Sequence, residues 1–222
     1  MICIPIMARD NNDALKKMSE AAPYADMVEI RLDVMDTFNP KTIIKAATCP
    51  VIMTYRSKKE GGKGLGNYRA RIDCLLSTIE AGADFVDVEW GLPLEFRQEI
   101  FQNRGSAKLI ISSHLLSGTP PREKLEAIFN KMAATGADIV KIISLARTPE
   151  DNLRILSLIP IAQRLGIKII AFAMGPTGRM SRIFTLLMGG FLTFSSLEEG
   201  QESASGQIPI KKMKKILEML ST

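Results

Sequence analysis

The sequence is poor in several residue types that mark particular classes of protein. It has three cysteines, Cys3, Cys49 and Cys74, which are odd in number and never spaced as Cys-x-x-Cys. Neither a disulfide framework nor a zinc site is therefore indicated, and a reducing compartment is expected. The chain has one tryptophan and no basic patch interleaved with aromatic residues, so it also lacks the features of a nucleic-acid-binding module.

Long apolar runs and targeting segments are absent as well. No apolar run approaches the roughly 18 residues that a transmembrane helix requires. Met1 is followed directly by the strand-like segment ICIPI, without the charged region and cleavage site of a secretory signal. We therefore expect a cytoplasmic protein that has no membrane partner.

The composition is that of an ordinary globular protein, with 46% hydrophobic and 24% charged residues in 222. This length exceeds the commonest domain size, but α/β barrels reach it as one domain. The net charge of +5 would attract either nucleic acid or a small anion. Four of the lysines lie beside an apolar stripe in the last helical segment, residues 210–220, and we interpret them as a solvated helix face.

Short apolar runs rich in β-branched residues recur along the whole chain. They lie at residues 2–6, 27–32, 51–55, 85–90, 109–113, 139–144, 168–173 and 191–195. Helix-like stretches that end on glycine separate them, such as 67–82 and 148–166. Strands that alternate with helices in this way form a parallel sheet, and eight such units close into a barrel. We predict one (β/α)8 TIM barrel over residues 1–222, with an open doubly wound sheet as the alternative.

Charged residues interrupt the predicted strands, where a buried strand should be almost continuously apolar. In the segment VEIRLD, Glu29, Arg31 and Asp33 alternate with apolar residues and are predicted to share one face near the carboxyl end of the strand. Arg56 ends the third strand and Glu60 follows in the next loop. Barrel active sites lie at this end of the strands. The alternatives for VEIRLD are a solvated strand face and a structural ion pair.

One amine and one imidazole stand out in the second half of the chain. Lys141 interrupts the apolar sixth strand, where an unpaired charge is costly. Desolvation favours the neutral amine, which can attack a carbonyl and form a Schiff base. His114 is the only histidine and follows the fifth strand at its carboxyl end. A single histidine is more often structural or exposed, but this position favours a catalytic role.

Two later segments have the features of anion-binding loops. Arg179 and Arg182 open the helix after the seventh strand, and Ser203 and Gln207 follow the eighth. An arginine can bind a carboxylate through two parallel hydrogen bonds, and a hydroxyl and an amide can complete such a site. We interpret Arg179 as a surface residue and Arg182 as the anion-binding one.

Taken in chain order, the motifs EIRLD, YRSKKEGG, SSH, VKI, MSR and SASGQIP resemble those of the type I 3-dehydroquinate dehydratase family. They span nearly the whole chain. The resemblance implies dehydration of 3-dehydroquinate to 3-dehydroshikimate in the shikimate pathway, without a metal ion or other cofactor. It also implies a homodimer. Some versions of the family are fused to a shikimate dehydrogenase, and we expect the present residues to form the barrel alone.

The resemblance assigns roles to individual residues. Lys141 matches the Schiff-base lysine and His114 the proton-transfer histidine. Many members have an acidic and an aromatic residue after this histidine, where the present chain has Leu115 and Leu116, and Glu60 is then the candidate that orients His114. The predicted substrate-binding residues are Glu29, Arg31, Arg56, Arg182, Ser203 and Gln207.

Two other enzyme classes fit part of the pattern. A Schiff-base aldolase would share the barrel and Lys141, but it would bind sugar phosphates and depend on the phosphate. A Mg²⁺ enzyme would use carboxylates such as Glu29, Asp33, Asp87 and Glu89, and it would lose activity to a chelator.

Overall fold

The computed structural model describes residues 1–64 and 67–220. Eight strands form one sheet in the order β7-β6-β5-β4-β3-β2-β1-β8. They are β1 (Ile2–Ile6), β2 (Met27–Arg31), β3 (Val51–Thr54), β4 (Phe85–Glu89), β5 (Lys108–Leu115), β6 (Ile139–Leu145), β7 (Lys168–Met174) and β8 (Thr193–Phe194). Pairing is parallel between β2 and β3, β3 and β4, β6 and β7, and β1 and β8.

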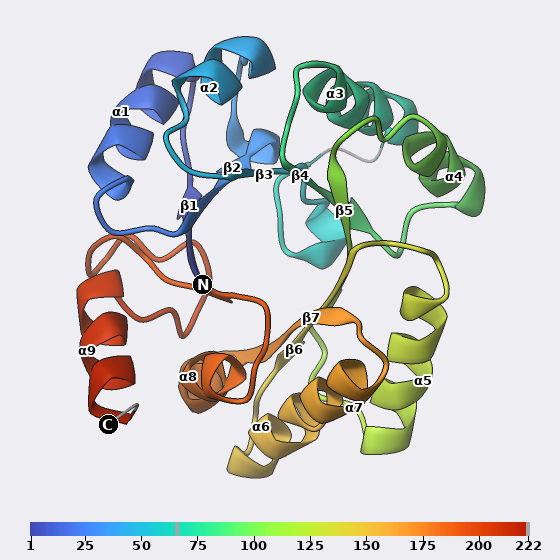
Figure 1. The fold of residues 1–222 in the computed structure, drawn as a ribbon, viewed down its shortest axis with the longest axis vertical. Helices are drawn as coiled ribbons and strands as arrows, with labels where there is room; N and C mark the ends of the chain where they lie inside the picture. Colours follow the sequence, from blue (N-terminus) through green and yellow to red (C-terminus); the bar gives the residue numbers. More distant parts are fainter. Residues whose placement is uncertain (65–66, 221–222) are drawn as a thin grey trace. The chain divides into compact units, whose positions relative to one another are not determined.

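Helices separate the successive strands from β1 to β8 (Figure 1). They are α1 (Asn11–Ala21), α2 (Pro40–Ala46), α3 (Tyr68–Glu80), α4 (Leu94–Gln102), α5 (Arg122–Ala133), α6 (Pro149–Leu156), α7 (Leu158–Arg164) and α8 (Arg179–Leu187), and α9 (Ile210–Leu220) follows β8. Three short 3-10 turns, η1 (Leu32–Val34), η2 (Lys58–Glu60) and η3 (Pro176–Gly178), lie after β2, β3 and β7. None of the helices within residues 1–64 and 67–220 is long and apolar enough to cross a bilayer.

The segment that leads into β8 lies between β7 and the start of β1. The Phe191 amide donates to the carbonyl of Ile169 in β7 at 2.7 Å, and the Thr193 amide donates to the carbonyl of Met1 at 3.1 Å. Strand order, parallel pairing and intervening helices are those of a (β/α)8 barrel. The predicted fold is confirmed.

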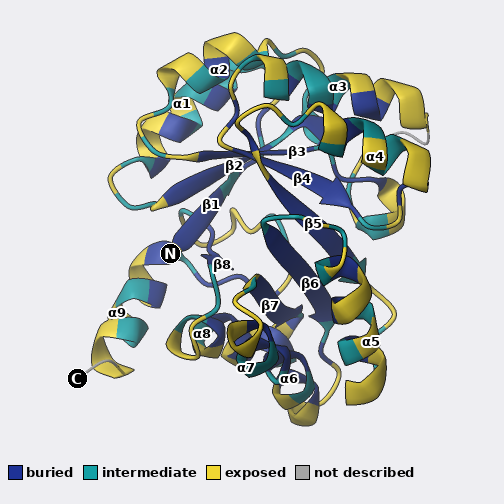
Figure 2. Cartoon of the chain, turned by 45° about the vertical axis from the view of Figure 1, so that its right-hand side comes forward, coloured by how far each residue is buried: buried dark blue, intermediate teal, exposed yellow. Residues whose placement is uncertain are grey.

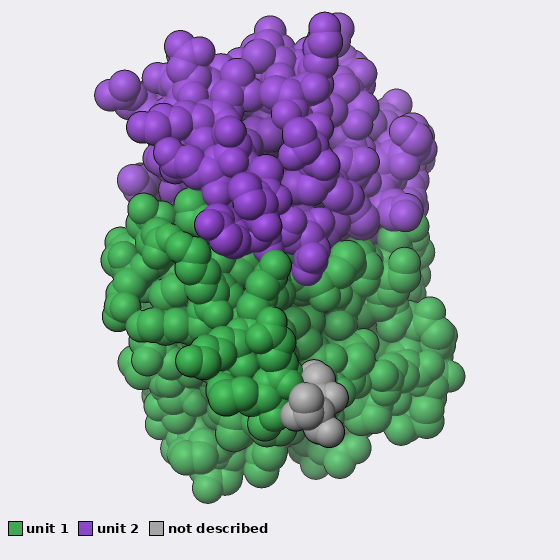
Figure 3. Space-filling view, turned by 60° about the vertical axis from the view of Figure 1, so that its left-hand side comes forward, with its two compact units in different colours: residues 1–3, 112–222 green, residues 4–111 purple. Residues whose placement is uncertain are grey.

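The chain forms two compact units (Figure 3). One comprises residues 4–111, and the other comprises residues 1–3 and 112–222. In each unit the strands are buried and the helices expose their outer faces (Figure 2). The single domain expected over residues 1–222 stays a prediction.

The structure corrects two local predictions. Strand β2 ends at Arg31, so Asp33 lies in the turn η1 and not on the strand face with Glu29 and Arg31. The helix-like stretch 148–166 is broken at Ser157 into α6 and α7. Pro160 has no amide hydrogen to donate to the carbonyl four residues earlier, which explains the break.

Candidate active site

A buried carboxylate lies on β2 in the unit formed by residues 4–111. Glu29 is 5% exposed, and the hydroxyl of Thr54 at the end of β3 donates to its Oε1 at 2.9 Å. The parallel register places Thr54 opposite Arg31. Sequence reasoning did not single out Thr54, whose only signal was a hydroxyl at the end of an apolar strand.

Arg31 is held by the carboxylate of Asp33, two residues later. Its Nε and Nη2 each donate to one carboxylate oxygen at 2.8 Å. Asp33 also accepts from the backbone amides of Arg56 at 3.2 Å and Lys63 at 2.9 Å. Burial raises the pKa of Asp33, but hydrogen bonds to the ionised carboxylate outweigh burial and leave the pKa below its usual value. Asp33 therefore ties the end of β2 to the loop after β3.

Arg56 is buried at the centre of a second ion-pair network. Its Nη2 donates to Asp87 Oδ1 at 2.8 Å, and its Nη1 donates to Glu89 Oε1 at 3.2 Å and to Glu60 Oε2 at 3.1 Å. Burial lowers the pKa of Arg56, but the surrounding carboxylates raise it by more than burial lowers it, so the net shift is upward. The predicted residues Arg56 and Glu60 are therefore brought together, and the guanidinium stays charged.

The carboxylates of the Mg²⁺ alternative are engaged with protein groups. Asp33 pairs with Arg31, Asp87 and Glu89 pair with Arg56, and Glu29 accepts from Thr54. Within residues 1–64 and 67–220, no cluster of three or more histidine, cysteine, aspartate or glutamate side chains is arranged to hold a metal ion.

The loop that carries Glu60 folds back tightly on Arg56. The Gly62 amide donates to the Ser57 carbonyl at 2.8 Å, and the Gly64 amide donates to the Arg56 carbonyl at 2.9 Å. A Cβ atom on Gly62 would lie 2.2 Å from the Arg56 carbonyl oxygen, and one on Gly64 would lie 2.6 Å from it. Only glycine permits this approach of main chain to main chain. Residues 65 and 66 of the same glycine-rich stretch lie outside the described residues.

The predicted nucleophile lies in the unit that contains residues 112–222. Lys141 is 3% exposed in β6, and its Nζ lies 4.7 Å from the ring centre of Phe194 in β8. The ring face attracts a cation. His114 is the penultimate residue of β5, the neighbour of β6 in the sheet order, and is half-buried. Lys141 is on a strand, as expected, whereas His114 lies within β5 and not after it, because β5 extends to Leu115.

Arg182 is a buried cation with no carboxylate partner among the described residues. It is 1% exposed in α8, and its Cζ lies 4.6 Å from the ring centre of Phe172. Its Nη atoms donate to the carbonyls of Phe194 at 3.5 Å and Ser205 at 3.2 Å, while Nε is buried without a hydrogen-bond partner. Burial lowers the pKa of Arg182 to about 9. Such a guanidinium favours an anionic ligand.

Ser203 and Gln207 lie together in the loop after β8. The Ser203 amide donates to Gln207 Oε1 at 2.9 Å, and Gln207 Nε2 donates to the Ser203 hydroxyl at 3.0 Å. Ser205, whose carbonyl accepts from Arg182, lies between them. The three residues predicted to bind an anion are thus brought to one place.

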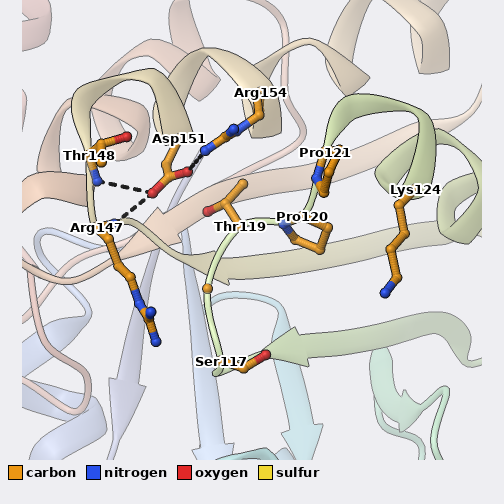
Figure 4. Close-up of a pocket in the computed structure, with 10 residues that line it drawn as sticks. Ser117, Thr119, Pro120, Pro121, Lys124, Arg147, Thr148, Asp151 and Arg154 are labelled. Carbon is orange, nitrogen blue, oxygen red and sulfur yellow. Dashed lines mark hydrogen bonds and ion pairs between the residues drawn. The ribbon is translucent and has the colours of Figure 1, made fainter.

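A pocket of about 420 Å³ lies between the loop after β5 and the start of α6 (Figure 4). Its lining comprises Ser117, Gly118, Thr119, Pro120, Pro121, Lys124, Arg147, Thr148, Asp151 and Arg154. Lys124 and Arg147 come from opposite sides of the pocket, and Asp151 pairs with Arg154. None of the predicted site residues lines it, and no sequence motif marked it.

The sequence model of the family described as type I 3-dehydroquinase matches residues 2–222. The chain belongs to the type I 3-dehydroquinase family. The 3-dehydroquinate dehydratase of Methanococcus maripaludis strain S2 is 37% identical over 225 residues that cover all of both chains. The chloroplastic bifunctional 3-dehydroquinate dehydratase/shikimate dehydrogenase of Arabidopsis thaliana is 40% identical over 217 residues. That match covers 95% of the present chain and 36% of the plant protein, so the chain spans about a third of it.

Solved structures of type I 3-dehydroquinases have the same fold. The type I 3-dehydroquinate dehydratase of Clostridium difficile, solved with covalent modified comenic acid, superposes with a TM-score of 0.87 at 27% identity. The match covers 99% of the present chain and 91% of that one. The predicted family and the enzyme class, a hydro-lyase, are confirmed.

Proposed function

We propose that the chain catalyses the dehydration of 3-dehydroquinate to 3-dehydroshikimate in the shikimate pathway through a Schiff base on Lys141. The observation that carries this proposal is the amine of Lys141, which is 3% exposed on a barrel strand and lies over the Phe194 ring. The neutral amine of a lysine is the nucleophile that forms a Schiff base with a carbonyl. The names of the type I relatives supply the substrate.

The proposed reaction divides covalent and proton-transfer chemistry between two residues. The Lys141 amine adds to the C3 carbonyl and loses water, which gives a cationic imine that acidifies the neighbouring C2 proton. His114 removes this proton, and the resulting enamine expels the C1 hydroxyl while His114 returns the proton to the leaving oxygen. Hydrolysis of the imine restores Lys141. One water is consumed for the one released at imine formation, so the net change is the loss of one water from the substrate.

Arg182 binds the substrate carboxylate in this proposal. Its buried charge, its unpartnered Nε and the absence of a carboxylate partner among the described residues support the role. A carboxylate would supply the missing charge and accept two parallel hydrogen bonds. Ser203 and Gln207 contribute a hydroxyl and an amide from the adjoining loop.

The remaining residues bind hydroxyls and orient the proton-transfer residue. Glu29, Arg31 and Arg56 bind substrate hydroxyls, and Glu60 orients His114. The ion pair between Arg56 and Glu60 supports the last role because it fixes one oxygen of the Glu60 carboxylate.

The proposal includes a cytoplasmic homodimer. Free thiols at all three cysteines agree with a reducing compartment. An apolar face on α8 and the residue after it supports the dimer, because Met180, Phe184, Leu187 and Met188 are 37–40% exposed there. Light scattering of the wild type and of Phe184→Lys tests it, and a monomeric wild type would refute it.

Borohydride trapping tests the proposed chemistry. Incubation with 3-dehydroquinate and borohydride, followed by peptide mass analysis, should place a reduced adduct on Lys141. Lys141→Ala should give neither adduct nor turnover, whereas Lys168→Ala, which removes an exposed lysine of β7, should behave as the wild type. His114→Ala should still give the adduct while turnover falls by about 10²–10⁴-fold. An adduct on another lysine, or none, would refute the proposal.

A further inference from the structure

We propose that Arg71, on the outer helix α3, is a positioning residue that holds the segment 56–60 through Glu89. The inference rests on the roles proposed above for Arg56 and Glu60. Arg71 is not among the residues that touch substrate in that proposal, and it lies in the second helical turn after the glycine-rich loop.

Arg71 faces the strands, although arginines on the outer helices of a barrel are usually solvated. It is 4% exposed. Its Nη2 donates to Glu89 Oε2 at 2.5 Å, and its Cζ lies 5.9 Å from the ring centre of Tyr55. Its Nε is buried without a hydrogen-bond partner. Burying a guanidinium in this way is costly, so the ion pair with Glu89 requires an explanation beyond simple packing.

Glu89 connects Arg71 to the loop after β3 because its two oxygens face different partners. Oε2 accepts from Arg71, whereas Oε1 accepts from Arg56 Nη1 at 3.2 Å and from the Ser57 amide at 2.8 Å. A carboxylate held from both sides in this way cannot rotate about its last bond without breaking a charged hydrogen bond. Arg71 therefore fixes the orientation in which Glu89 receives Arg56 and Ser57.

Ser57 in turn sets the position of Glu60. It is the N-cap of the turn η2, where its hydroxyl and its carbonyl accept from the Glu60 amide at 3.3 and 3.1 Å. Arg56 Nη1 holds the Glu60 carboxylate at 3.1 Å. The backbone and the carboxylate of Glu60 are thus held by Ser57 and Arg56, which both bind Glu89. Arg71 in turn holds Glu89.

The charges of the network give Arg71 a second effect. Three carboxylates, those of Glu60, Asp87 and Glu89, pair with Arg56, and Arg71 adds the second cation. Glu29 and Arg31 also act on Arg56 through their charges. Without Arg71, Arg56 alone would pair with the three carboxylates, and like charges favour retention of a proton by one of them. The variant should therefore need a higher pH to ionise the network.

The experiment compares Arg71→Met, Arg71→Lys and a matched control, Arg69→Met. Arg69 lies in the same helix, is 47% exposed and pairs with Asp73 and Glu99. For each variant, kcat and KM for 3-dehydroquinate are measured between pH 5 and 9, together with borohydride trapping and thermal unfolding.

Arg71→Met should lower kcat/KM at pH 7 by about 10-fold or more, by analogy with the effect of removing residues that orient metal ligands. The acidic limb of its pH profile should move to higher pH, while borohydride still traps the substrate adduct on Lys141. Arg71→Lys, which restores the charge but not the fork of donors, should recover part of the activity and most of the pH profile. Arg69→Met should resemble the wild type. A wild-type kcat/KM and pH profile in Arg71→Met, with only a lower unfolding temperature, would overturn the proposal.

A double-mutant comparison keeps the test decisive if Arg71→Met does not fold. Glu89→Gln removes the charge that Arg71 balances and nearly preserves the shape of the side chain at position 89. If Arg71 acts through Glu89, the pair Arg71→Met with Glu89→Gln should have the kcat/KM of Glu89→Gln alone within about twofold. A further independent loss would contradict the proposal. Failure of the wild type itself to dehydrate the substrate would instead count against the proposed function.

Discussion

The substitution Asp33→Asn should strongly destabilise the protein. The Asp33 side chain is fully buried and accepts four hydrogen bonds, two from Arg31 and two from backbone amides. Asparagine keeps one oxygen acceptor and replaces the other oxygen with an NH₂ group. Donors that now face this NH₂ group would lose their acceptor, and Arg31 would lose its counter-charge.

The expected loss follows from the burial of the two partners. Removing one partner of a buried ion pair costs about 3–5 kcal/mol of unfolding free energy. Because the Arg31 side chain is 12% exposed, water can solvate part of its unpaired charge. We therefore expect a loss at the lower end of this range, about 3 kcal/mol. That is a large share of the roughly 5–15 kcal/mol that stabilises a typical domain.

The pH dependence provides a separate check. The folded-state pKa of Asp33 lies below its usual value, so the stabilisation is fully present above the unfolded-state pKa of about 3.9. It is lost as the pH falls through the lower folded-state pKa. The difference between wild type and Asp33→Asn should therefore be complete at pH 7 and shrink below about pH 4.

Urea unfolding followed by circular dichroism at pH 7 and at pH 3 measures this difference. Asp13→Asn is the control because Asp13 also has a pKa below its usual value, but its pair with Lys17 is partly exposed and should be worth less than about 1 kcal/mol. A loss at pH 7 no larger for Asp33→Asn than for Asp13→Asn would refute the reasoning. So would a difference that stays constant to pH 3.

Three further predictions concern binding, metals and thiols. Arg182→Ala should raise the KM for 3-dehydroquinate about 30-fold, because the loss of a charged hydrogen bond costs about 2 kcal/mol of binding free energy. The kcat should change little, since this hydrogen bond is made in both the ground state and the transition state. Arg179→Ala, one turn earlier and exposed, should leave KM unchanged. Since burial lowers the pKa of Arg182 to about 9, wild-type KM should also rise above pH 9, and a flat profile would contradict this. Dialysis against a chelator should leave activity unaltered, and restoration of lost activity by Mg²⁺ or Zn²⁺ would refute a metal-free mechanism. Burial raises the pKa of Cys74 to about 12, so a thiol reagent at pH 8 should modify Cys74 far more slowly in the native than in the urea-unfolded protein, and equal rates would contradict its burial.

The strands could be predicted closely because local sequence determines them. The runs at 2–6, 51–55 and 139–144 are apolar, β-branched and bounded by helical patterns, and β1, β3 and β6 match them within one residue. A period of two residues cannot reveal where a strand turns into a 3-10 helix. The prediction for Asp33 failed for that reason, since the turn depends on donors from residues 56 and 63.

Sequence reasoning singled out the proposed site residues but not the residues that hold them. A lysine within an apolar strand is unusual in itself, so Lys141 could be recognised and its burial expected. Arg71 lies in an ordinary helical pattern. Its burial depends on Glu89, which is 18 positions away and faces it only in the folded unit. Long-range pairing of this kind leaves no local pattern in a single sequence.

The folding of the glycine-rich loop onto Arg56 limits how this enzyme can be redesigned. At positions 62 and 64 a Cβ atom would meet the main-chain carbonyl of Arg56, and at position 64 also the Tyr55 ring; no exchange of side chains can remove the carbonyl. A library that randomises residues 62–64 to change substrate preference would therefore lose most of its members to displacement of Arg56 and Glu60. Diversity is better introduced at Lys58 and Lys59, whose side chains are exposed on the same turn.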